Sequence, residues 1–504
     1  MEPEQASGRH LLGRTSVVSG MTLLSRILGL VRDAVLARYF STSLVMDAFL
    51  VANRIPNMLR RFFAEGAFSQ GFVPVMARYR EQHDHDEARE FVDAVAGTFG
   101  VVLFLVTLGG VVAAPLLVAI VAPGFIGDDG RFEIATLMLR FTFPYLFFVS
   151  LTAFAGGILN TYGRFGVPAF TPVILNVVLI AGAVWLSPLL AEPGMALAYA
   201  VFIAGVLQLA FQVPFLVRIR ALPRPRWDVA HEGVRRVMRL MLPAIFGSSV
   251  AQINVLVGGI IASMLGVGKI SLLYYSDRLM EFPLGLFGIA LATVTLPHLS
   301  RQFANADHAG FGATLDWSMK LVMLIAVPAA VGLVVLAEPL VATIFYGGEF
   351  VADDVRMTAL ALQAFAIGLV GFSFVKILAP AFFSREDTKT PVQIALIALA
   401  VNFVLSVGLA WWLTAIGYAG SHAGLALATS VAALLNALLL YLRLRKDGVF
   451  AHSAGWLKLL LQVGVANVVM CVLIAWLNQP LAWWLAIDAL GRIAWLAACV
   501  GGGA

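Results

Sequence analysis

Long apolar segments recur along the whole chain, and they constrain its fold more than any other feature. About 20 apolar residues suffice for a helix to cross the hydrocarbon core of a membrane. Fourteen such segments can be placed, at residues 16–40, 44–77, 91–122, 134–160, 168–189, 195–217, 238–265, 270–300, 315–346, 357–384, 391–415, 420–443, 457–476 and 482–500. Because 60% of the 504 residues are hydrophobic and only 12% are charged, a water-soluble core could not hold them. The sequence predicts an all-α polytopic membrane protein with about 14 transmembrane helices.

The charges of the connecting loops alternate. Basic residues gather after the second, fourth, sixth, eighth, tenth and twelfth segments, whereas the opposite loops, such as 127–130 and 349–354, are short or acidic. Basic loops stay in the cytoplasm, so we expect both termini there. The N-terminal residues lack the apolar core and cleavage site of a secretory signal, so we expect them to be retained.

A weak internal repeat divides the chain. Arg54 precedes Pro74 by twenty residues, and Arg278 precedes Pro297 by nineteen. The pairs Pro168 with Asn176 and Pro391 with Asn402 mark a second match. A parallel repeat of six helices predicts two lobes related by an axis along the membrane normal.

These observations predict three regions. The boundaries are residues 1–222 for an N-terminal lobe, 223–446 for a C-terminal lobe with a basic linker at 218–239, and 447–504 for the last two helices.

Charged residues interrupt the first two apolar segments, where each one facing lipid would cost about 2.5–3.5 kcal/mol. They are Arg26, Arg32, Asp33, Arg38, Asp47, Arg54, Arg60, Arg61 and Glu65. Such side chains face water or protein instead of lipid. Since six are arginines and three are carboxylates, we predict a locally positive, water-filled cavity that binds an anion.

Helical spacing indicates which side chains share a face. Arg26 and Asp33 are seven residues apart on one stripe, and Arg32 points about a third of a turn away. The second segment carries two polar rows, namely Asp47, Arg54, Arg61 and Glu65, and beside them Asn53, Asn57 and Arg60.

For several arginines in and near these segments, the sequence also allows a purely structural role at the membrane interface in place of anion binding. Arg38, Arg78 and Arg80 lie near helix ends, where long side chains reach the membrane interface. Arg60 and Arg61 would do the same if their helix entered the membrane late.

Ion pairing alone is a second alternative. It applies to Arg26 and Arg32 with Asp33, and to Arg278, which lies within one turn of Asp277 and Glu281. Ion pairs of this kind would not explain why the first two segments carry more arginines than carboxylates.

Motifs for metal binding or catalysis are weak. Cys471 and Cys499 form no CxxC pattern, and the tract at 83–86 lies in a charged loop that predicts a solvated surface. The sequence contains no HExxH. We therefore predict no enzymatic activity, no metal site and no cofactor.

Three motifs closely resemble the MurJ (MviN) lipid II flippases of bacteria. They are MTLLSRILGLVRD at 21–33, PNMLRRFFAEGAFSQGFVP at 56–74 and YYSDRLMEFP at 274–283, and the resemblance extends over residues 12–500. It implies the fold of the multidrug/oligosaccharidyl-lipid/polysaccharide exporter superfamily. In that fold two pseudo-symmetric six-helix lobes form a V around a central cavity, and two C-terminal helices are added.

The same resemblance implies roles for individual residues. The substrate-binding arginines would be Arg26, Arg32, Arg60 and Arg278, and the supporting cavity residues would be Asp33, Asp47, Asn57, Glu65 and Glu281. A guanidinium engages phosphate oxygens bidentately, which suits a diphosphate.

The implied activity is transport. The family moves undecaprenyl-diphosphate-linked disaccharide pentapeptide from the cytoplasmic to the periplasmic leaflet of the bacterial inner membrane, so alternating access without bond breakage is expected. Helices 13 and 14 would form a groove for the lipid tail. The expected partners are lipid II and membrane lipids, with the peptidoglycan-synthesis machinery as the candidate protein partner; we expect a monomer that binds no nucleic acid.

The energy source and one alternative function stay open. Residues 240–265 and 392–442 contain no Asp or Glu, which disfavours a carboxylate sodium site and leaves the membrane potential or an unidentified ion. A drug/cation antiporter of the same fold would instead present acidic and aromatic residues to its substrate.

Overall fold

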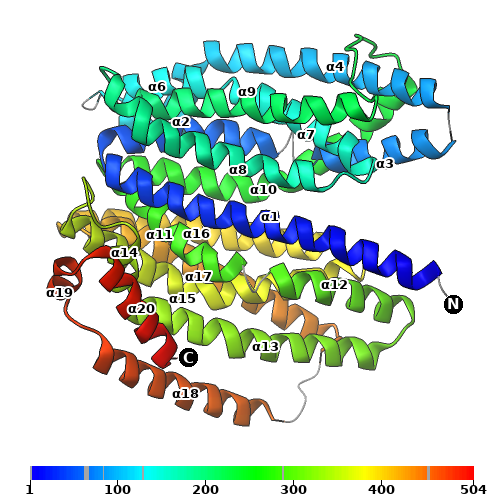
Figure 1. The fold of residues 1–504 in the computed structure, drawn as a ribbon. Helices are drawn as coiled ribbons and strands as arrows, with labels where there is room; N and C mark the ends of the chain where they lie inside the picture. The colour runs from blue at the N-terminus through cyan, green and yellow to red at the C-terminus, as the bar shows by residue number, and fades with distance from the viewer. Residues whose placement is uncertain are drawn as a thin grey trace. The chain divides into compact units, whose positions relative to one another are not determined.

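The protein is helical throughout the part of the chain that can be described. The computed structural model describes residues 3–61, 67–82, 84–127, 130–285, 289–450 and 455–503. Within these ranges long helices dominate (Figure 1) and the β-structure is a single bridge between Gly347 and Phe350. The predicted all-α architecture is therefore confirmed.

The first half of the chain contributes ten α-helices. They are α1 (Pro3–Phe40), α2 (Leu44–Arg60), α3 (Ala67–Gln82), α4 (His85–Val112), α5 (Ala114–Val121), α6 (Arg131–Thr142), α7 (Tyr145–Thr161), α8 (Gly166–Ala181), α9 (Met195–Arg218) and α10 (Glu232–Ser263). A π-helical turn, Gly182–Leu186, extends α8.

The second half contributes another ten α-helices. They are α11 (Lys269–Pro283), α12 (Ile289–Ala304), α13 (His308–Val335), α14 (Ala337–Ile344), α15 (Ala352–Phe383), α16 (Lys389–Ala415), α17 (Ser421–Lys446), α18 (Trp456–Leu477), α19 (Leu481–Ala486) and α20 (Ala489–Gly503).

The chain forms two compact units, Met1–Ile260 and Ile261–Ala504. In the first unit α1 packs on α8, α2 on α6, and α7 and α8 on α9. In the second, α15 packs on α13 and α17, and α16 on α17. The three predicted regions, 1–222, 223–446 and 447–504, stay a prediction.

Nine helical segments of the described chain are long and apolar enough to cross a membrane. They include α4, α9, α13 and α16. The charge-bearing helices α1, α2 and α11 are not among them. The protein is a multi-pass membrane protein, and the count of fourteen spans stays a prediction.

The order of helix lengths recurs in the two units. Both α4 and α13 are 28 residues long, and each is followed at once by a helix of eight residues, α5 and α14. The sequence markers Asn176 and Asn402 lie buried in α8 and α16. The predicted repeat of two six-helix lobes stays a prediction.

Close contact between α15 and α17 depends on small residues. A methyl group added at Gly368 would come within 2.6 Å of Ser430 Oγ, and one added at Gly371 within 2.7 Å of the Ala433 backbone. Ser430 Oγ donates a 2.7 Å hydrogen bond to the Ala364 carbonyl. Small residues that let backbones approach are the main source of helix association in lipid, where apolar burial gives little gain.

The basic segment after α9 is held against α4. Arg226 forms a 2.9 Å ion pair with Glu90, and the Arg224 amide donates a 2.6 Å hydrogen bond to Asp93 Oδ1. Nearby, Tyr79 of α3 stacks on Phe91 with ring centroids 4.4 Å apart. Burial of its hydroxyl raises the pKa of Tyr79, and the charges of Glu232 and Glu87 act in the same direction.

Several predicted spans are divided between two helices, namely 44–77, 91–122, 134–160, 270–300, 315–346 and 482–500. The segment expected at 482–500 is divided between α19 and α20. Asp488 lies at the division, and its Oδ1 accepts a 3.0 Å hydrogen bond from the Gly491 amide. Aspartate favours this helix-starting position because its carboxylate satisfies an otherwise free amide, so a new helix begins here.

Candidate functional site

A hydrogen-bonded network fixes Arg32 in α1. Arg32 Nη2 lies 2.6 Å and Nε 2.9 Å from Asp33 Oδ1, while Nη1 donates to Asn176 Oδ1 of α8 at 2.9 Å. Asn176 Nδ2 returns a 3.0 Å hydrogen bond to the Ser25 carbonyl. The Arg32 side chain is 16% exposed and that of Asp33 3%. The network orients the guanidinium and joins α1 to α8.

The partner of Asp33 differs from the pairing that helical spacing favoured. Spacing placed Asp33 on the stripe of Arg26, but the carboxylate bonds its immediate neighbour Arg32. An arginine side chain is long enough to fold back along the helix, which backbone periodicity does not describe.

Arg26 lines a cavity of about 390 Å³ in the first unit. Thr22 and Ser25 of α1 contribute to its wall, together with Asn160 of α7 and Phe165 at the start of α8. Arg26 is exposed and forms no hydrogen bond or ion pair with the part of the chain that the structure describes. Its charge is thus available to a ligand in this cavity.

Arg60 lines a second cavity, of about 300 Å³, in the same unit. The wall is built from α2, α3, α7, α8 and α9, and its polar members are Arg60, Tyr145, Thr152, Asn160, Thr171, Gln208 and Gln212. Asn160, Pro168 and Pro172 line both cavities. The two cavities therefore adjoin, with Arg26 on the wall of one and Arg60 on the wall of the other.

The neighbouring arginines of α2 contact α10 instead. Arg61 Nη1 donates to Gln252 Oε1 at 3.4 Å. The Arg54 guanidinium lies against Gly259, where an added methyl group would overlap Nη1. Arg60, from one of the two polar rows predicted for this helix, therefore lines the cavity, whereas Arg54 and Arg61 of the other row contact α10.

Asp47, at the start of α2, is fully buried. The charge that interacts with it belongs to Arg131 at the start of α6, which is also buried and lies 4.6 Å from the Phe125 ring centroid. Asp47 is thus placed with Arg131, a residue that the sequence gave no reason to select.

Asn57 and Glu65 are the two remaining supporting residues predicted in the first unit. Asn57 is half-buried, and its Nδ2 donates a 2.9 Å hydrogen bond to the Asn53 carbonyl one turn earlier. Glu65 lies outside the described residues.

In the second unit Arg278 pairs with Glu281. Arg278 Nη1 lies 2.9 Å from Glu281 Oε2, and its guanidinium carbon is 4.9 Å from the Tyr274 ring centroid. The two side chains are 40% and 51% exposed, so a ligand could reach the guanidinium. The ion pair expected from the spacing is present.

Two polar residues inside an apolar helix were not identified from the sequence. Gln208 and Gln212 of α9 line the Arg60 cavity, and their spacing of four residues in an otherwise apolar segment is the signal that could have found them.

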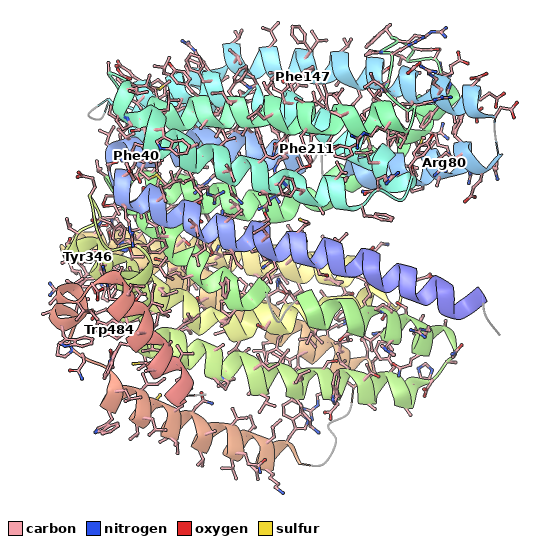
Figure 2. The ribbon with its side chains drawn as sticks, viewed as in Figure 1. Phe40, Arg80, Phe147, Phe211, Tyr346 and Trp484 are labelled. Carbon is pink, nitrogen blue, oxygen red and sulfur yellow. The ribbon has the colours of Figure 1, made fainter. Side chains whose placement is uncertain are left out.

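Arg492 of α20 is a further buried charge that was not selected. It donates a 3.0 Å hydrogen bond to the Ala342 carbonyl of α14 and lies 5.0 Å from the Tyr346 ring centroid. Tyr346 and Trp484 are labelled at this end of the second unit in Figure 2. The contact fixes α20 to α14.

Within the first unit, Arg80 of α3 meets the end of α7. Its guanidinium donates to the Thr161 carbonyl and lies 4.2 Å from the Tyr162 ring centroid. Arg80 itself is labelled in Figure 2. The predicted interfacial role of Arg80 stays a prediction.

Among the described residues, no three His, Cys, Asp or Glu side chains are grouped so that they could hold a metal ion.

Comparisons with known proteins agree with the motif resemblance. The family model described as "Lipid II flippase MurJ" matches residues 36–493. A probable lipid II flippase MurJ of Vibrio cholerae is 44% identical over 99% of this chain and 95% of its own length. The lipid II flippase MurJ of Burkholderia cenocepacia is 44% identical over 96% and 93%.

Solved structures give the same result. A lipid II flippase MurJ in an inward closed conformation matches with a TM-score of 0.78 at 26% identity, covering 96% of each chain. An inward-facing multidrug transporter of the MATE family, in the MOP superfamily, matches with a TM-score of 0.63 at 15% identity over 86% of this chain and 94% of that one, which shows a shared fold alone. The chain belongs to the MurJ family of lipid II flippases.

Proposed function

We propose that the protein moves lipid II, the undecaprenyl-diphosphate-linked peptidoglycan precursor, from the cytoplasmic to the periplasmic leaflet of the bacterial inner membrane. Membership of the MurJ family supports the substrate and the location. The process is transport without bond breakage, so the protein acts as a carrier and not as an enzyme. Both termini lie in the cytoplasm under this proposal.

The observation that carries the proposal is the placement of Arg26 and Arg60 on two adjoining cavities of one unit. A diphosphate presents several anionic oxygens, and guanidinium groups bind such oxygens with paired hydrogen bonds. Arg32 is held by Asp33 and Asn176, and Arg278 of the second unit is the fourth arginine of the proposal. Asp33 orients Arg32, and Glu281 pairs with Arg278. Asp47, Asn57 and Glu65 are the other proposed supporting residues.

Transport then follows an alternating-access cycle. The cavity accepts the headgroup from the cytoplasmic side and later opens to the periplasm, while the polyprenyl tail stays in lipid along α18 and α20. The exposed valines of α18, Val465, Val468 and Val472, suit contact with such a tail. The arginines must bind with intermediate affinity, because a tightly held headgroup would not be released.

The membrane potential is the proposed energy source. Each elementary charge that crosses 100 mV gains or loses about 2.3 kcal/mol, so movement of a charged headgroup or of cavity arginines can be coupled to the potential. No cofactor is required by this scheme. A drug/cation antiporter is the alternative on fold alone, and the arginine-lined cavities favour an anionic substrate over a cation.

The test is depletion of the chromosomal protein and complementation with Ala at Arg26, Arg32, Arg60 or Arg278, with lipid II exposed on the outer leaflet as the readout. We expect each substitution to abolish exposure. Arg54→Ala is the matched control, since Arg54 packs on α10. Full rescue by all four Ala variants would overturn the proposal.

A further inference from the structure

Two glutamines lie one helical turn apart in the middle of α9. Gln208 and Gln212 are 3% and 1% exposed, in a helix whose other buried residues are apolar or glycine. Polar groups at membrane depth are costly unless they are hydrogen bonded or line a functional cavity. Both residues line the 300 Å³ cavity that also contains Arg60.

The hydrogen bonds fix which amide atoms are used. Gln208 Nε2 lies 3.1 Å from the Thr171 carbonyl, which only accepts, so a donor must face it. Gln212 Nε2 lies 3.0 Å from Thr171 Oγ1. That hydroxyl already donates to the Val167 carbonyl at 3.2 Å and therefore accepts from Gln212.

The remaining amide oxygens are left for another donor. Gln208 Oε1 and Gln212 Oε1 are buried and accept no hydrogen bond from the described residues. Leaving a buried acceptor unsatisfied costs about 1–3 kcal/mol, so two such atoms on residues that line one cavity favour a ligand that brings its own donors. The Asn160 side chain, on the wall shared by both cavities, also forms no hydrogen bond with the described part of the chain.

A cation does not fit this environment. Carbonyl oxygens can coordinate Na⁺ or K⁺, but the cavity already contains the Arg60 guanidinium, and the described residues of its wall include no carboxylate. In a medium of low dielectric constant a second positive charge would be repelled. Neutral N–H and O–H donors avoid that repulsion.

We propose that this cavity binds the sugar that is attached directly to the diphosphate, with its hydroxyl and N-acetyl N–H groups donating to Gln208 Oε1 and Gln212 Oε1. The inference rests on the proposed function, in which the diphosphate lies at Arg60 and Arg26. The volume of 300 Å³ is at the lower end of small-molecule pockets, about 300–1,000 Å³. That volume is sufficient for one sugar ring. Gln208 and Gln212 would thus distinguish a glycosylated lipid diphosphate from the bare lipid carrier.

The test compares two ligands on the purified full-length protein. Affinities for lipid II and for undecaprenyl diphosphate, which has no sugar, are measured for the wild type, Gln208→Met and Gln212→Met. Loss of one buried hydrogen bond predicts about tenfold weaker binding of lipid II and unchanged binding of undecaprenyl diphosphate. Gln363→Met is the matched control, because Gln363 lies in a membrane helix of the second unit and bonds the Val334 carbonyl at 3.1 Å.

The outcomes separate this inference from the proposed function. If both glutamine variants bind lipid II as the wild type does, or lose affinity for both ligands equally, the sugar site is wrong. If Arg60→Ala leaves the binding of both ligands unchanged, the diphosphate site fails instead. Thermal unfolding of each variant identifies a folding defect, and the two separate glutamine variants keep the test decisive if one is unstable.

Discussion

Asn176 of α8 accepts a 2.9 Å hydrogen bond from Arg32 of α1 and returns a 3.0 Å bond to the Ser25 carbonyl of the same helix. One buried amide therefore joins two helices and sets the direction of a guanidinium. The arginine is positioned by a residue 144 positions away in the sequence.

Replacing Asn176 by Ala tests the importance of this orientation. A hydrogen bond to a charged group contributes about 1.5–3 kcal/mol, so we expect a lower thermal unfolding temperature and reduced lipid II exposure in complementation. Asn402→Ala is the matched control because Asn402 is the buried counterpart in α16. If the two variants lose activity equally, stability and not the orientation of Arg32 explains the effect.

The buried charges of Asp47 and Arg131 should depend on each other. Replacing Asp47 by Asn leaves Arg131 as an uncompensated buried charge, at a cost of about 3–5 kcal/mol. We expect a strong loss of thermal stability in detergent, and a partial recovery when Arg131→Met is added to Asp47→Leu. A double variant as unstable as the sum of the single ones would show that the residues act independently.

Trp456 should attach α18 to α13. Its Nε1 donates a 2.6 Å hydrogen bond to Asp316 Oδ1, and Lys320 Nζ pairs with Asp316 Oδ2 at 2.8 Å. Trp456→Phe removes the bond to a charged acceptor, so unfolding should become easier by about 1.5–3 kcal/mol. The exposed Trp411 provides the comparison, since Trp411→Phe should change the unfolding free energy by less than about 0.5 kcal/mol.

Asp387 should make the loop before α16 sensitive to acid. Hydrogen bonds from the Thr390 side chain and amide, the latter 3.0 Å from Oδ1, lower the pKa of this carboxyl, and Arg385 acts in the same direction. A lowered pKa means that the stabilisation is present above the unfolded-state pKa and is lost as the pH falls through the folded-state pKa.

Asp387→Ala should therefore cost about 1 kcal/mol at neutral pH and much less in acid. Thermal unfolding measured between neutral and acidic pH checks this, with Glu386→Ala as the control. A loss of stability that does not change with pH would contradict the assignment.

Part of the site could be predicted because it depends on local spacing. Arg278 and Glu281 are three residues apart on one helix, and helical geometry alone brings them together. Spacing along α2 also places Arg60 on a different helix face from Arg54 and Arg61. The sequence did not indicate which of these side chains lines the cavity.

Other relationships could not be predicted from spacing. Asp33 bonds Arg32 and not Arg26, because Arg26 lies about two helical turns away on the same stripe while Arg32 is its immediate neighbour. Asp47 meets Arg131, and Thr171 meets Gln208 and Gln212, across helices that are distant in sequence. A single sequence carries no information on which helix faces are opposed.

The sequence by itself determined the class of the protein, since apolar segments of spanning length leave helices as the means of satisfying the backbone in lipid. It also determined that buried arginines need an aqueous or anionic environment, because the cost of a charge in lipid does not depend on the fold. Only the tertiary structure decided that Arg26 and Arg60 line adjoining cavities, that Asn176 holds Arg32, and that two glutamine oxygens accept no hydrogen bond within the described part of the chain. Those outcomes depend on packing between helices, which small residues such as Gly368 and Gly371 permit but which spacing along one helix does not specify.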